Sequence, residues 1–155
     1  VRDPREFVRS GMRRNYYRGQ GAWEEGRLRP HASDPMSEEW ESREQFDQVC
    51  WLWAETYRHI EKLREQIGED RVMVVKFEDL IAGPDITGKM FEFLSLDGFD
   101  ADKVRGVLGQ KLNAQQVGEF PHPADWPADL HERCWAEVGE IAARYGYQEK
   151  YVRRR

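Results

Sequence analysis

The spacing of apolar residues predicts a chain that is mostly helical. Between Phe46 and Ile67, apolar side chains recur every three or four residues, the period that places them on one face of an α-helix. We expect Asp34-Pro35 or Ser37 to cap the start of this helix and Gly68 to end it, since glycine favours the turn that follows a helix. The same period predicts further helices over about 4–17, 84–97, 101–108 and 127–145, the first of them with Asp3 as its N-cap and Pro4 in its first position.

One segment has the pattern of a strand instead. Residues 72–77 contain an unbroken apolar run, Val-Met-Val-Val, which is typical of a strand buried on both faces of a parallel sheet. A single strand cannot pair its own backbone groups, so three arrangements stay open. The sheet is completed by residues outside this chain, copies of the chain associate, or the fold is largely helical. We favour the first, and the predicted fold class is α/β, mostly helical with one parallel strand.

Composition excludes several classes of protein. The 155 residues are about one domain's worth of chain, and no apolar run reaches the roughly 18 residues that cross a bilayer. We expect no signal peptide, because residues 1–4 open the sequence with no apolar stretch behind them. Cys50 and Cys134 fall within helical patterns, which argues against a disulfide framework and for a reducing compartment. The four histidines lack the paired spacing of a metal site. We therefore expect a cytoplasmic protein without a membrane span or a metal.

The charge is unevenly distributed. Residues 1–31 hold eight arginines against four acidic residues, whereas the rest of the chain is strongly acidic and brings the formal net charge to −5. A local cluster of arginines suits a phosphate-bearing ligand, because the guanidinium fork matches phosphate oxygens in pairs. The acidic remainder argues against nucleic acid, whose binding needs a broad cationic surface. The pattern favours a small phosphorylated ligand.

Two stretches resemble the sulfotransferases that use 3′-phosphoadenosine 5′-phosphosulfate (PAPS) as their donor. Residues 1–5, Val-Arg-Asp-Pro-Arg, with Ser10 eight positions after Arg2, resemble the family segment in which a strand ends in Arg-(Asp/Asn)-Pro and a helical serine follows. The run 72–77 leading into Phe-Glu-Asp-Leu at 77–80 resembles a second family stretch, which usually reads Tyr-Glu-Asp-Leu. The resemblance covers essentially this whole chain but only the C-terminal half to two-thirds of the family domain.

The resemblance implies four nucleotide-binding residues. Arg2 and Ser10 would hold the 3′-phosphate of PAPS and of its product adenosine 3′,5′-bisphosphate. Phe77 would touch the nucleotide with its ring, and Lys111 would lie near the donor. Each residue has a structural alternative. Arg2 could pair with an acid, Ser10 could be an ordinary helical serine, Phe77 could pack in the core, and Lys111 could be a surface lysine.

The resemblance also implies a fold like that of P-loop nucleotide-binding proteins, with residues 1–155 as the C-terminal portion of a single sulfotransferase domain. The family's phosphosulfate-binding loop and catalytic base would then lie upstream of Val1. No glycine-rich loop ending in Lys-Ser or Lys-Thr occurs in the sequence, so we assign no catalytic residue and expect this fragment alone to be inactive. The intact enzyme would transfer a sulfuryl group to the hydroxyl or amine of a small-molecule or carbohydrate acceptor.

Two functions from other classes stay open. The chain could be a non-catalytic nucleotide-binding or interaction module that retains the 3′-phosphate pocket. It could also be a helical protein whose arginine cluster binds a protein or an acidic polymer. A loop with Lys-Ser or Lys-Thr encoded upstream of Val1 would favour the enzyme, and a start codon near Val1 would favour a module. The acceptor itself cannot be read, because acceptor specificity depends on variable loops.

Overall fold

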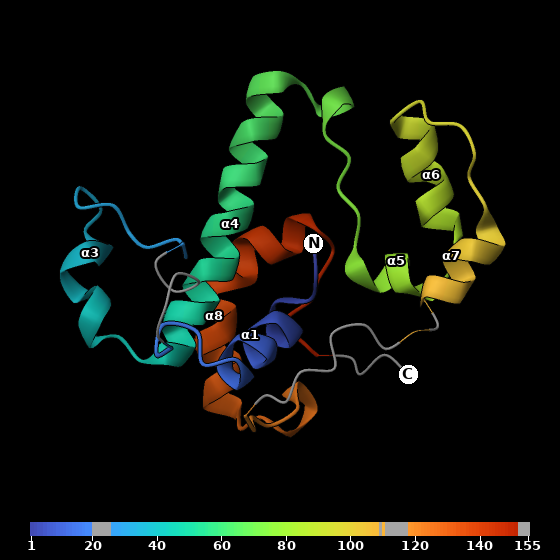
Figure 1. Cartoon of the computed structure of the whole chain (residues 1–155). Helices are drawn as coiled ribbons and strands as arrows, with labels where there is room; N and C mark the ends of the chain where they lie inside the picture. The colour runs from blue at the N-terminus through green and yellow to red at the C-terminus, as the bar shows by residue number, and fades with distance from the viewer. Residues whose placement is uncertain (20–25, 109, 111–117, 152–155) are drawn as a thin grey trace. The chain divides into compact units, whose positions relative to one another are not determined.

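The structure, a computed structural model, describes residues 1–19, 26–108, 110 and 118–151. Throughout these residues the regular secondary structure is helical, and no strand or sheet occurs among them (Figure 1). The predicted α/β fold with a P-loop-like sheet is therefore wrong. The chain divides into two compact units. The first unit consists of Val1–Arg2 and Glu61–Gln116, and the second unit consists of Asp3–Ile60 and Val117–Arg155.

The longest described helices of the second unit are α1 (Pro4–Arg13), α8 (Ala128–Arg144) and the part of α4 (Gln45–Ile67) that ends at Ile60. Asp3 caps α1 by accepting a hydrogen bond from Arg5 N, and Pro4 occupies the first turn, as the sequence predicts. The apolar period predicted for α4 and α8 is confirmed for the first half of α4 and most of α8, where its members are buried. These core residues are Phe46, Val49, Cys50, Trp53, Cys134, Val138, Ile141 and Ala142.

Two short helices precede α4 in place of the predicted helix start near Ser37. These are α3 (Met36–Glu39) and the 3₁₀ turn η1 (Trp40–Ser42), and they are separated from α4 by Arg43, whose backbone is extended. Trp40 is buried between aromatic rings, with ring centroids 5.1 Å from Tyr17 and 5.0 Å from Trp51. Burial of this ring explains why the chain turns here rather than continuing as one helix.

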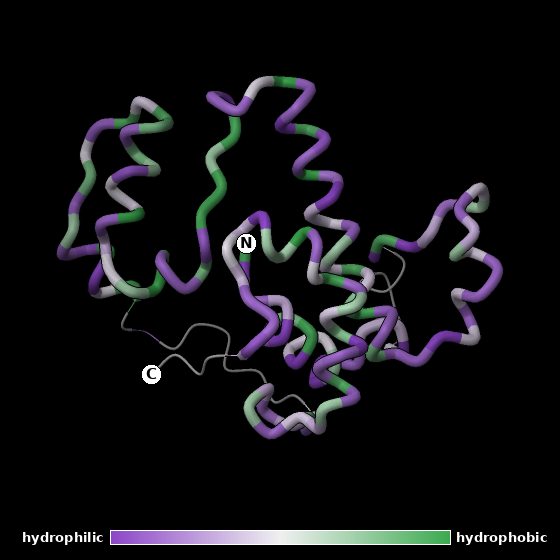
Figure 2. The backbone as a smooth tube through the Cα atoms, turned by 180° about the vertical axis from the view of Figure 1, so that it is seen from behind, coloured by the Kyte–Doolittle hydropathy of each residue, from purple (hydrophilic) through white to green (hydrophobic). Residues whose placement is uncertain are grey.

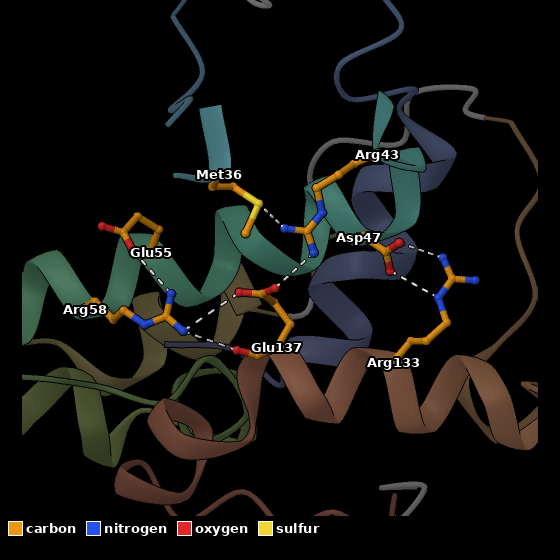
Figure 3. Close-up of polar contacts among 7 residues, drawn as sticks. All are labelled: Met36, Arg43, Asp47, Glu55, Arg58, Arg133 and Glu137. Atoms are coloured by element: carbon orange, nitrogen blue, oxygen red, sulfur yellow. Dashed lines mark hydrogen bonds and ion pairs between the residues drawn. The ribbon is translucent and has the colours of Figure 1, made fainter. Parts of the chain in front are cut away.

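Ion pairs and hydrogen bonds join α8 to α4 and to Arg43, which lies between η1 and α4 (Figure 3). Arg133 donates from Nε and Nη2 to the two carboxylate oxygens of Asp47, at 3.2 and 2.7 Å. The Glu137 carboxylate accepts from Arg43 Nη2 at 3.3 Å, and the Glu137 carbonyl accepts from Arg58 Nη2 at 3.4 Å. These groups are partly exposed, so each pair contributes about 1 kcal/mol or less. Their main effect is to fix how the two helices pack.

In the first unit, residues 72–76 form an extended segment, which Figure 2 shows as a largely green, apolar stretch of the tube. Val1 N donates to the Val75 carbonyl at 2.6 Å, and Phe77 N donates to the Val1 carbonyl at 2.6 Å. Two hydrogen bonds to one residue do not make a ladder, so the prediction of a parallel strand over 72–77 is wrong. The β-branched residues favour an extended backbone, but a sheet also requires a second strand, and none lies in the described residues.

Short helices follow the extended segment: α5 (Phe77–Ala82), α6 (Asp85–Phe93) and α7 (Ala101–Leu108). The predicted helix over 101–108 is confirmed at both ends. The helix predicted over 84–97 ends earlier, because Ser95 has a φ of 52° and Gly98 a φ of 81°, both outside the range of a right-handed helix. The helix predicted over 4–17 also ends early, with Asn15 at a φ of 57°.

The first unit leaves large apolar side chains exposed. They are Leu63, Ile67, Phe77, Ile81, Phe93, Leu94, Leu96, Phe99 and Val107. The sequence pattern predicts that Phe93 and Leu94 face inward, but their side chains are 41% and 57% exposed, so that prediction is wrong. The end of α4 behaves similarly, since Leu63 and Ile67 are exposed although they continue the helical period. Periodicity identifies the apolar face of a helix, but only a packing partner buries it.

Candidate functional site

Arg2 and Phe77, two of the residues predicted to bind the nucleotide, lie against each other in the first unit. The Arg2 guanidinium carbon lies over the Phe77 ring, 5.2 Å from the ring centroid. Arg2 is half-buried and Phe77 is 40% exposed, so the contact is accessible to solvent on one side. A cation over an aromatic face is attracted by the ring quadrupole, and this attraction holds the planar guanidinium close to the ring.

Backbone pairing places Arg2 beside Phe77. Val1 is bonded to Val75 and Phe77 through both its N–H and its carbonyl group, which fixes the next residue, Arg2, near the end of the extended segment. Phe77 is also the first residue of α5, so its position is set by a helix start as well as by the hydrogen bond to Val1. Backbone hydrogen bonds therefore position both residues of the contact, Arg2 next to Val1 and Phe77 at the start of α5.

Neither of the other two predicted nucleotide-binding residues is among the described residues of the first unit. Ser10 lies in α1, half-buried, and belongs to the second unit. Lys111 lies outside the residues that the structure describes. Glu78 and Asp79, the acidic residues after Phe77, lie in the first turn of α5, where carboxylates favour the positive end of the helix dipole.

A buried arginine that sequence reasoning did not single out lies at the start of α1. Arg5 is only 3% exposed, and its side chain donates from Nε and Nη2 to the two carboxylate oxygens of Asp3, at 3.1 and 3.0 Å. Arg5 Nη1 donates to the Glu149 carbonyl at 2.8 Å. The guanidinium also lies over the rings of Trp135 and Tyr151, 5.6 and 5.0 Å from their centroids. These contacts tie the start of α1 to the C-terminal part of the second unit.

A second polar cluster surrounds Glu6, also on α1. Tyr151 Oη donates to Glu6 Oε1 at 2.6 Å, and His122 Nε2 lies 3.4 Å from the same oxygen. His122 Nδ1 accepts a hydrogen bond from Ala124 N at 3.2 Å, which leaves Nε2 to carry the proton that faces Glu6. Burial raises the pKa of the Tyr151 hydroxyl, and its hydrogen bond to Glu6 raises that pKa further. The cluster thus connects the segments that contain His122 and Tyr151 to α1.

No protein-family model, curated protein or solved structure matches the chain. The resemblance to sulfotransferases therefore rests on the residues quoted above. Among the described residues, no group of three or more His, Cys, Asp or Glu side chains is arranged to hold a metal ion. None of the helices described combines the length and the apolar composition that a membrane crossing requires.

Proposed function

We propose that the chain binds the 3′-phosphoadenosine part of PAPS through Arg2 and Phe77, as part of a PAPS-dependent sulfotransferase. The observation that carries this proposal is the contact between these two side chains. The resemblance assigns both of them to the same nucleotide, and they lie together although 75 positions separate them in the sequence.

The chemistry of the pair suits a 3′-phosphorylated nucleoside. The Arg2 guanidinium carries parallel N–H donors that match two phosphate oxygens. The exposed part of the Phe77 ring offers an apolar surface next to that charge, suited to a flat adenine or to the edge of a ribose. Phenylalanine lacks the hydroxyl of the family's usual tyrosine, so its contribution is apolar.

Titration calorimetry with variants of the full chain tests this proposal. The wild-type protein should bind adenosine 3′,5′-bisphosphate more tightly than adenosine 5′-phosphate. Arg2→Gln should remove about 2 kcal/mol of this preference, roughly 30-fold in Kd, because it removes a charge-assisted contact to the 3′-phosphate. Phe77→Leu should weaken both nucleotides alike, because the ring does not distinguish them.

Arg14→Gln is the matched control, since Arg14 is an exposed arginine of the second unit. This variant should leave both affinities unchanged. A merely structural Arg2 would weaken both nucleotides to the same extent, and an undiminished preference in Arg2→Gln would contradict the proposal. Far-UV circular dichroism of each variant shows that the comparison is made between folded proteins.

In the intact enzyme, an acceptor hydroxyl or amine would attack sulfur in line while adenosine 3′,5′-bisphosphate leaves. The residues of this chain would contribute positioning of the donor and stabilisation of its charge. The two buried free thiols, Cys50 and Cys134, are consistent with a reducing compartment, so we place the protein in the cytoplasm.

An interaction module without a nucleotide site is the second candidate, and the exposed apolar side chains of the first unit favour it. The same titration separates the two candidates. A module that has no nucleotide site would bind neither adenosine 3′,5′-bisphosphate nor adenosine 5′-phosphate.

A further inference from the structure

The second unit contains a surface cavity whose lining includes neither Arg2 nor Phe77. Its volume is about 430 Å³, and its lining combines two arginines with an aromatic ring. The lining residues are Arg9, Arg13, Glu119, Phe120 and Pro121. Arg9 and Arg13 are four positions apart on α1, so they share one face of the helix.

Arg13 is positioned by a hydrogen bond from its Nε, which leaves its terminal nitrogens to contact a ligand. Its Nε donates to the Gly118 carbonyl at 3.0 Å, and Gly118 N donates back to the Arg13 carbonyl at 2.9 Å. This double contact holds the segment that begins at Gly118 beside the end of α1. A guanidinium has five N–H donors, and among the described residues no carboxylate pairs with Arg13. Its two terminal nitrogens are therefore available at the cavity.

Arg9 has a buried N–H group without an acceptor. Its Nε is enclosed and makes no hydrogen bond to the residues that the structure describes. The carboxylate that faces Arg9 belongs to Glu6, whose Oε2 lies 3.9 Å from Arg9 Nη1, beyond hydrogen-bond length. Glu6 Oε1 already accepts from Tyr151 at 2.6 Å. The enclosed Nε is out of reach of a ligand, but the Arg9 side chain as a whole is 29% exposed and lines the cavity, so its charge can attract an anion there.

The aromatic wall of the cavity is held rigidly. Phe120 stacks on Phe46 with ring centroids 6.1 Å apart and meets the edge of Trp126 at 6.0 Å. Trp126 Nε1 donates to the Pro121 carbonyl at 3.1 Å, which fixes the neighbouring backbone. Glu119 is exposed, so water screens its charge and the two arginines dominate the lining.

We infer that this cavity binds an oxyanion carried on a flat ring, such as an aryl sulfate, phosphate or carboxylate. The oxyanion accepts hydrogen bonds from Arg9 and Arg13, and the ring packs against Phe120. The three oxyanions share this chemistry, and separate probes distinguish them. This site does not depend on the nucleotide site proposed above, because it uses none of the same residues.

Titration calorimetry of the full chain tests the inference with naphthalene-2-sulfonate, 2-naphthyl phosphate and 2-naphthoate as probes. Two further compounds separate the parts of the ligand: 2-naphthol carries the ring without the charge at pH 7, and inorganic sulfate carries the charge without the ring. At least one of the three ring-bearing anions should bind tenfold or more tightly than either compound, and its affinity should fall as salt is added.

Arg9→Gln and Arg13→Gln should each weaken that anion at least fivefold. Arg14→Gln, which changes an exposed arginine beside Arg13 that does not line the cavity, should change its affinity less than twofold. In the wild-type protein, nuclear Overhauser effects should connect the probe's ring protons to Phe120, a readout that needs no variant. Equal binding of 2-naphthol, unchanged affinity in both arginine variants, or ring contacts elsewhere would each overturn the inference.

Discussion

Replacing Arg5 by alanine should destabilise the second unit by about 3 kcal/mol, because it removes one partner of a buried ion pair. The side chains of Arg5 and Asp3 are only 4% and 15% exposed, and three side-chain hydrogen bonds of Arg5 would be lost. Losses for such pairs are about 3–5 kcal/mol. We expect the lower end, since Asp3 still accepts from the backbone N–H of residue 5.

Tryptophan fluorescence during urea unfolding measures this loss directly, because every tryptophan of the chain falls within the residue ranges of the second unit. Arg5→Lys keeps the charge but not the planar fork, so its unfolding free energy should lie between those of the wild type and Arg5→Ala. Arg14→Ala, an exposed control, should stay within about 0.5 kcal/mol of the wild type. The reasoning is refuted if Arg5→Ala is as stable as Arg14→Ala.

Three further outcomes are expected. Burial and the hydrogen bond to Glu6 raise the pKa of Tyr151, so its stabilising effect is complete below the ordinary tyrosine pKa of about 10 and is lost as the pH rises above it. Tyr151→Phe should therefore cost about 1.5 kcal/mol at pH 7, and its deficit should shrink in unfolding curves above pH 10. Burial also raises the pKa of the Cys50 thiol, which lies in hydrogen-bonding contact with Cys134. Neither thiol should react with Ellman's reagent until urea unfolds the protein, and rapid labelling in buffer would contradict this. With radiolabelled PAPS the chain alone should transfer no sulfuryl group to any acceptor, and turnover above a buffer blank would show that it does carry the chemistry.

Local signals in the sequence account for the parts of the fold that were predicted. The Asp3 cap and the buried faces of α8 and of the first half of α4 depend on residues within one or two helical turns of each other, and these are confirmed. The helix over 101–108 has the same local origin. The run at 72–77 shows where such signals end, since its residues favour an extended backbone but do not provide the partner strand that a sheet needs.

The polar contacts of α1 could not be predicted, because they join residues far apart in the chain. Arg5 bonds to a carbonyl 144 positions away, and Glu6 bonds to a hydroxyl 145 positions away. Helical geometry turns Arg5 away from Ser10 but does not indicate that Arg5 is buried. The candidate site was predicted in part: the resemblance singled out Arg2 and Phe77, whereas their contact is tertiary and only the structure brings them together.

Phosphorus NMR of bound adenosine 3′,5′-bisphosphate tests the central proposal most directly, because the nucleotide reports each phosphate as a separate signal. If Arg2 holds the 3′-phosphate, that signal should shift on adding the wild-type chain, and the shift should be absent with Arg2→Gln. Once each protein is saturated with nucleotide, the 5′-phosphate signal should respond equally to both proteins. A 3′-phosphate signal that does not move with the wild-type chain, or that moves equally with Arg2→Gln, would contradict the proposed nucleotide site.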